Sequence, residues 1–266
     1  MQLTLLCVGD VVGGPGRQVL RQALEVLVDR HRVDCVIVNA ENVAGGSGLT
    51  AALYEKLVRY GVDLITLGDH VYRRRDIIPV LETSDRIVRP ANLPMAAPGR
   101  TAAVATTRSG HKVAVISLLG RMFMPTQANC PFAAVDRVLD GLPSDVKVIV
   151  VDMHAEVTSE KIAMGWHLDG RVSVVFGTHT HVPTGDARVL PGGTAYMTDL
   201  GMTGPYDSVL GRCKHRVLSA LTTGVPTNFD VATDDVRLRG ALISVEAGTG
   251  RATSIEAIEF MATADG

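Results

Sequence analysis

The order of hydrophobic and polar residues divides the first half of the chain into short apolar runs and amphipathic stretches. Residues 3–8, 34–38 and 62–67 are nearly continuous apolar runs, as expected for strands that are buried on both faces. Between them, residues 18–30 carry apolar side chains at helical spacing, and Thr50 is well placed to cap a second helix. This alternation predicts a doubly wound α/β unit.

A third helical stretch is expected to carry the basic run Arg73-Arg74-Arg75, ahead of a proline-punctuated region over residues 79–98. We interpret the run as a solvent-exposed helix face. A basic rim that attracts phosphate esters is the alternative.

From residue 101 onward the pattern favours paired strands. Turn residues join three such pairs, over residues 102–107 and 113–118, residues 187–190 and 194–197, and residues 241–246 and 254–260. Two further buried strands, residues 146–151 and 172–176, alternate with helical stretches at residues 132–142 and 159–165, and another helix is expected near residues 215–221. Two packed sheets with helices outside would account for both halves. Because no linker separates the halves, we expect one domain over residues 1–266.

Acidic or imidazole side chains follow each of the five predicted buried strands that alternate with helices. These residues are Asp10, Glu41, Asp69 with His70, His154, and His179 with His181. Ligands of open α/β sheets bind outside the carboxyl ends of the strands, so we expect these side chains to meet. If the backbone stays extended past Gly177, His179 and His181 point to the same side and converge on one point.

A mixture of imidazoles and carboxylates suits iron, manganese or zinc better than calcium or structural zinc. Six or seven donors exceed what one ion needs, which predicts two ions that share a carboxylate. Such a pair, ~3.5–4 Å apart, activates a bridging hydroxide and binds a phosphoryl oxygen at the same time.

Composition narrows the class of protein. The chain is 46% hydrophobic with a formal net charge of −2, which fits a globular protein and excludes a disordered one or one that coats nucleic acid broadly. The four cysteines include no CxxC pair, and we expect Cys7 and Cys35 to be reduced core residues of a cytoplasmic protein. No signal peptide and no run of membrane-spanning length is evident, so no membrane contact is expected.

The motifs at the five strand ends resemble, in the same order, those of the calcineurin-like metallophosphoesterases, and most closely their bacterial YmdB-type branch. They are Gly9-Asp10-Val11-Val12-Gly13, Asn39-Ala40-Glu41-Asn42, Leu67-Gly68-Asp69-His70, Met153-His154-Ala155-Glu156 and Gly177-Thr178-His179-Thr180-His181. The segment Asp199-Leu200-Gly201-Met202-Thr203-Gly204-Pro205 extends the similarity towards the carboxyl terminus.

This resemblance implies an α/β fold, a four-layer α/β/β/α sandwich of two mixed sheets, and hydrolysis of 2′,3′-cyclic nucleotides at the 2′ bond. It implies that a first metal ion is held by Asp10, Glu41, Asn42 and His181, and a second by Glu41, Asp69, His154 and His179. Glu41 would bridge two divalent or mixed-valence ions, with iron as the first candidate and manganese or zinc as alternatives. A hydroxide that bridges the metals would attack phosphorus while His70, as general acid, protonates the leaving ribose oxygen.

One position departs from the family pattern. The motif after the third strand normally carries Asn before the His, whereas this chain has Asp69. An anionic ligand in place of a neutral amide lowers the net positive charge of the metal pair. We therefore expect tighter binding of the second ion and a less acidic bridging water.

Two other functions remain as alternatives, a broad phosphomonoesterase and a metal-bound regulatory or RNA-interaction protein with residual catalysis. The expected partner is a small-molecule cyclic nucleotide or phosphate ester, with RNA ends as a further candidate. A homo-oligomer is compatible with the sequence, which assigns no substrate-binding residue.

Overall fold

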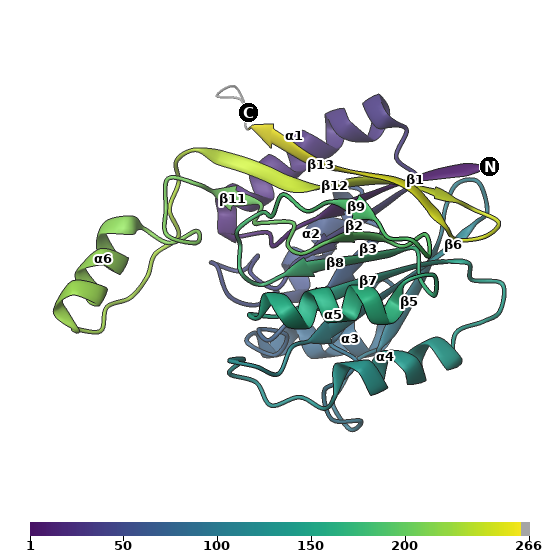
Figure 1. The fold of residues 1–266 in the computed structure, drawn as a ribbon. Coiled ribbons are helices and arrows are strands. Elements are labelled where there is room, and N and C mark those ends of the chain that lie inside the picture. Colours follow the sequence, from purple (N-terminus) through teal and green to yellow (C-terminus); the bar gives the residue numbers. More distant parts are fainter. Residues whose placement is uncertain (262–266) are drawn as a thin grey trace.

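Two mixed β-sheets stacked face to face form the centre of the computed structural model, which describes residues 1–261 (Figure 1). The first sheet has the strand order β11-β12-β1-β2-β3-β4, with β13 paired to β12. Its strands are β1 (Gln2–Val8), β2 (Cys35–Asn39), β3 (Leu64–Thr66), β4 (Ile87–Val88), β11 (Gly204–Pro205), β12 (Val236–Glu246) and β13 (Ala252–Met261). Strands β1 to β4 are parallel, whereas β12 is antiparallel to β1, β11 and β13.

The second sheet has the strand order β5-β6-β7-β8-β10-β9. Its strands are β5 (Ala102–Thr106), β6 (Lys112–Leu119), β7 (Val148–His154), β8 (Val174–Thr178), β9 (Arg188–Val189) and β10 (Ala195–Met197). The four central strands are parallel, and β5 and β9 are antiparallel at the two edges. The three strand pairs predicted from turn residues are all present, as β5 with β6, β9 with β10, and β12 with β13.

Helices cover the outer face of each sheet. Those on the first sheet are α1 (Gly13–His31), α2 (Ala51–Arg59) and α3 (Ile78–Thr83), and those on the second are α4 (Pro131–Asp140) and α5 (Thr158–Leu168). Helix α6 (Lys214–Thr223) projects away from the sheets (Figure 1). The four-layer α/β/β/α sandwich predicted from the resemblance is therefore confirmed. Among residues 1–261, no helix is both long and apolar enough to cross a membrane.

Strand β1 illustrates why the apolar runs are continuous. Leu5 and Cys7 pack into the core between the sheets, and the alternate residues Leu6 and Val8 pack against the helices of the first sheet. Because both faces are covered, both sets of side chains must be apolar. Cys7 and Cys35 are buried and free of disulfides, as predicted. The single domain expected over residues 1–266 stays a prediction.

The predicted position of the third helix, on the arginine run and ahead of Pro79, is wrong. Arg73 and Arg74 lie in a bend, Arg75 opens the short 3₁₀-helix η1 (Arg75–Ile77), and α3 begins at Ile78. The start is set by Pro79, whose fixed φ and missing N–H suit the first helical turn and no later one. The three arginines are exposed to solvent and are not part of the core.

Candidate metal centre

The carboxyl ends of five parallel strands bring all the predicted site residues together. Asp10 follows β1, Glu41 and Asn42 follow β2, Asp69 and His70 follow β3, His154 ends β7, and His179 and His181 follow β8. Contacts between neighbouring members of this set connect all eight side chains. The polar side chains at the strand ends therefore form one cluster, as predicted.

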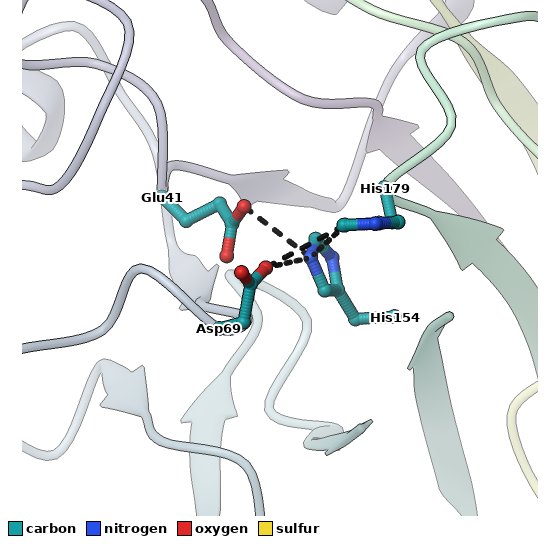
Figure 2. Close-up of side chains that lie close together, drawn as sticks. All are labelled: Glu41, Asp69, His154 and His179. Atoms are coloured by element: carbon teal, nitrogen blue, oxygen red, sulfur yellow. Dashed lines mark hydrogen bonds and ion pairs between the residues drawn. The ribbon is translucent and has the colours of Figure 1, made fainter. Parts of the chain in front are cut away.

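One part of the cluster, which we call the Asp69 subsite, consists of Glu41, Asp69, His154 and His179. One ligand atom from each residue lies within 4.8 Å of all the others, and Figure 2 shows the four side chains pointing towards one another. Nε2 of His154 lies 3.1 Å from Oδ1 of Asp69 and 3.3 Å from Oε1 of Glu41. Nδ1 of His179 lies 3.0 Å from the same His154 nitrogen. This group could hold a metal ion.

The other part, the Asn42 subsite, consists of Asp10, Asn42 and His181 together with the shared Glu41. Nδ2 of Asn42 lies 3.3 Å from Oε1 of Glu41, 3.2 Å from Nε2 of His181 and 3.5 Å from Oδ1 of Asp10. Glu41 thus contacts members of both subsites through Oε1. A cation in the Asn42 subsite would require the amide to reverse, because only Oδ1 of Asn42 can bind a metal ion.

The charges of the cluster fit bound cations. Asp10 and Glu41 are 0% and 1% exposed, and the side chain of Asp69 is 3% exposed. Within residues 1–261, no lysine or arginine forms an ion pair with any of the three, and their charged neighbours are histidines. Burying three carboxylates without fixed positive charge is costly, and divalent ions would remove that cost.

The histidine at the centre responds to these carboxylates. Burial alone would lower the pKa of His154, but Glu41 and Asp69 raise it well above its ordinary value. In turn, although burial opposes the change, His154 lowers the pKa of both carboxyls. A proton on His154 therefore occupies the place that a cation would take.

Buried hydrogen bonds orient His154 from behind. Its Nδ1 lies 2.8 Å from Oγ1 of Thr178, and that hydroxyl donates to Oδ1 of Asp152 at 2.6 Å. Because the Thr178 proton is committed to Asp152, Oγ1 accepts from His154 Nδ1, which leaves Nε2 directed at the Asp69 subsite. Asp152 is fully buried, also accepts from Asn39 and Thr66, and has a pKa that burial raises to about 6.

The loop with the two histidines is not extended, so the predicted convergence of His179 and His181 on one point is wrong. Their φ angles are 93° and 64°, in the left-handed region that costs about 1–3 kcal/mol for a residue other than glycine. The two left-handed residues turn the side chains apart. His179 enters the Asp69 subsite, and His181 enters the Asn42 subsite.

Residues 199–202 hold this loop in place. Thr180 donates to Oδ2 of Asp199 at 2.6 Å, and the same oxygen accepts from Nζ of Lys161 at 2.7 Å. The backbone N–H of Met202 donates to the carbonyl of His181 at 3.1 Å. The motif that begins at Asp199, quoted above only for its similarity, therefore supports both subsites.

His70 lies at the rim of the cluster. Its Nδ1 is 2.8 Å from Oδ1 of Asn42 and 3.4 Å from Oε1 of Glu41, and its side chain is 24% exposed. Its backbone N–H donates to Oε2 of Glu41 at 3.2 Å. The imidazole is thus close to both subsites and also open to solvent.

Sequence reasoning missed several polar side chains that support the cluster or touch it. They are Asp152, Lys161, Thr178, Asp199 and Glu156, whose Oε2 lies 3.2 Å from Nε2 of His179. Two features of the sequence could have indicated such residues. Asp152 lies inside the apolar run of β7, and Lys161 lies in α5 at a position that packs into the core.

Comparison with known proteins identifies the family. A family model described as YmdB-like protein matches residues 6–258. The chain belongs to that family. It is 41% identical over 256 residues to the 2′,3′-cyclic-nucleotide 2′-phosphodiesterase of Bacillus subtilis (strain 168), and the alignment covers 96% of each chain. The resemblance stated from the strand-end motifs is confirmed, and with it the assignment of this YmdB-like chain as a phosphoester hydrolase.

Two solved structures share the fold. A hypothetical protein from Thermus thermophilus superposes with a TM-score of 0.91 at 38% identity, covering 98% of this chain and 100% of the other. The crystal structure of a novel phosphatase from Mycoplasma pneumoniae also gives a TM-score of 0.91, at 34% identity, covering 98% of this chain and 94% of the other.

Proposed function

We propose that this YmdB-like protein hydrolyses 2′,3′-cyclic nucleotides at the 2′ bond, with two metal ions and with His70 as general acid. The observation that carries the proposal is the arrangement around Glu41, which contacts both subsites and His70. The name of the Bacillus subtilis relative supports the substrate class. The first ion would be held by Asp10, Glu41, Asn42 and His181, and the second by Glu41, Asp69, His154 and His179.

The division of labour follows from the side chains. Two bound divalent ions would supply Lewis-acid stabilisation of the charge that develops on the phosphoryl oxygens. Glu41 and the other carboxylates set the charge of the centre, and Thr178 directs Nε2 of His154 into it. His70 can deliver a proton to the leaving 2′ oxygen and recover one from water, because its imidazole borders both the centre and solvent.

The first experiment is metal analysis of protein purified without chelator or affinity metal, followed by turnover of 2′,3′-cyclic AMP. We expect about two iron, manganese or zinc ions per chain and release of the 3′-monophosphate. Release of the 2′-monophosphate would contradict the bond assignment. Absence of metal even after reconstitution would contradict the site.

The second experiment tests His70. We expect His70→Ala to keep its metals and to lose turnover by ~10²–10⁴, the usual contribution of a positioned proton donor. His215→Ala is the matched control, because His215 is an exposed histidine of α6 outside the cluster. Loss of both ions in His70→Ala, but not in the control, would make His70 a structural residue instead.

A broad phosphomonoesterase is the second candidate, favoured by the description of the Mycoplasma pneumoniae structure as a phosphatase. The test is whether the same preparation converts the 3′-monophosphate product to the nucleoside. Conversion at a rate comparable with ring opening would favour the broader activity. The resident metal, RNA ends as substrates, the oligomeric state and the cytoplasmic location stay predictions.

A further inference from the structure

A cavity of about 480 Å³ lies between residues 89–102 and the carboxyl end of α4. Three arginines line it, Arg89, Arg100 and Arg137, and no aspartate or glutamate does. None of its lining residues belongs to the metal centre, so it is a separate feature of the surface. Its volume falls in the range of small-molecule pockets, about 300–1,000 Å³.

Arg89 is the most informative of the three. It is 3% exposed, and two of its N–H groups donate to backbone carbonyls, Nε to Ala97 at 3.1 Å and Nη1 to Pro90 at 2.8 Å. No carboxylate forms an ion pair with it in the described chain. A guanidinium has five N–H donors, so three remain once these two bonds are made.

The two other arginines are exposed and also lack acidic partners. Arg100 donates from Nε to the carbonyl of Ser84 at 2.9 Å, and Arg137 forms no ion pair among residues 1–261. Three positive charges therefore line one concave surface to which no carboxylate contributes. Because burying the unpaired charge of Arg89 is costly, this arrangement is typical of a site whose anion arrives with the ligand.

We propose that this cavity, which we call the arginine pocket, binds the phosphate group of a small molecule. The planar guanidinium suits phosphate because it can donate two parallel hydrogen bonds, and two further arginines match a dianion or a diphosphate. A concave site of this volume has room for a free phosphate or a nucleotide. The proposal does not depend on the reaction at the metal centre.

The test is isothermal titration of the metal-loaded protein with inorganic phosphate at constant ionic strength. We expect the wild type to bind one more phosphate per chain than the double variant Arg100→Gln/Arg137→Gln, or to bind it at least tenfold more tightly. Turnover at the metal centre should be equal in both proteins, which separates this site from phosphate bound to the metals.

The matched control is Arg30→Gln/Arg59→Gln. These arginines are exposed, form no ion pair among residues 1–261, and lie in the last turns of α1 and α2, as Arg137 does in α4. The control therefore removes the same charge outside the pocket. Equal weakening in both double variants would reduce the effect to general electrostatics and overturn the proposal. Unchanged binding in Arg100→Gln/Arg137→Gln would also overturn it.

A second measurement tests the role of Arg89 without substituting this buried residue. Crystals of the wild type soaked in phosphate should show an oxyanion within hydrogen-bond distance of Arg89, and crystals of Arg100→Gln/Arg137→Gln should not. Competition by a nucleoside monophosphate then distinguishes the sources. Displacement at concentrations well below those of free phosphate identifies a nucleotide ligand, and displacement only at equal concentrations identifies phosphate itself. An oxyanion that occupies the pocket in both crystals, and only at the phosphate concentration of the soak, would be an adventitious ion only. That result would contradict the proposal.

Discussion

The Asp69 and Asn42 subsites share Glu41 and take one histidine each from the same loop, but the fold supports them differently. In the Asp69 subsite, His154 belongs to β7 itself, is fully buried, and is oriented by side chains from two strands of the same sheet. In the Asn42 subsite, Nδ1 of His181 donates to the carbonyl of Leu210, which lies in the segment that leads to the projecting α6 (Figure 1).

The two subsites are alike in formal charge and differ in how firmly the fold holds their side chains. Each subsite contains two carboxylates, Glu41 with Asp69 in one and Glu41 with Asp10 in the other. Formal charge therefore does not distinguish the two. The strand-embedded support of the Asp69 subsite does, since a preoriented ligand loses less freedom on binding a metal. We expect the ion of the Asp69 subsite to bind more tightly.

The largest expected effect comes from the residue that both subsites share. Glu41→Gln should lower the metal content from about two ions to below one per chain and reduce turnover at least ~10³-fold, because it removes charge from both subsites. Elemental analysis and turnover measure this, with the exposed Glu25→Gln as control. A variant that keeps one ion at full occupancy would show that Glu41 serves a single subsite.

Asp69→Asn should break the charge balance between the subsites. It replaces a carboxylate of one subsite by the amide that the family resemblance implies, and we expect about 10–100-fold weaker binding of one ion only. Competition with a metal-sensitive dye should resolve two metal affinities. We expect the ion of the Asp69 subsite to be the tighter of the two in the wild type and the weaker of the two in Asp69→Asn. An equal loss of affinity for both ions would mean that the two subsites bind metal as one unit.

Thr178→Val tests the support of His154 without changing a ligand. It removes the hydroxyl that fixes the imidazole orientation, so we expect about tenfold weaker metal binding in the Asp69 subsite. Saturating metal should restore most of the turnover, and Thr178→Ser should bind metal like the wild type. If Thr178→Ser is as weak as Thr178→Val, side-chain packing matters more than the hydrogen bond.

Thr180→Val should affect the two subsites alike, by only a few-fold. It removes the hydrogen bond from the left-handed loop to Asp199 and leaves the buried ion pair with Lys161 intact. Both metal affinities should therefore fall by a similar factor, and Thr180→Ser should retain them. Weaker binding of only one ion would contradict the expectation that the hydrogen bond of Thr180 supports both subsites.

The smallest effect concerns Asp186, which accepts hydrogen bonds from Thr184 and Thr198 beside the supporting segment. Burial acts to raise the pKa of Asp186, but these bonds outweigh it and lower the pKa. Its contribution to stability is thus present above the unfolded pKa of about 3.9 and is lost as pH falls through the lower folded pKa. Asp186→Asn should cost about 0.5–1 kcal/mol in urea unfolding at pH 7 and less at low pH. A cost independent of pH would contradict the assignment.

The members of the cluster were predictable because each follows or ends a buried strand, which is a local property of the sequence. Parallel strands present their carboxyl ends at one edge, so polar residues directly after buried strands must meet, and Asp10, Glu41 and His154 did. The position of the third helix was not predicted, because Pro79 suits only the first helical turn and the helix therefore begins after the three arginines.

By itself, the sequence determined the four layers, the edge where the cluster forms and the identity of its members, because hydrophobic periodicity and strand ends are local properties. The tertiary structure alone decided that His179 and His181 separate, since their left-handed backbone is held by Thr180 and residues 199–202, which are distant in sequence. It alone placed Asp152 behind His154 and left Arg89 without a carboxylate. Partners of buried polar groups come from other strands and loops, and no local pattern specifies them.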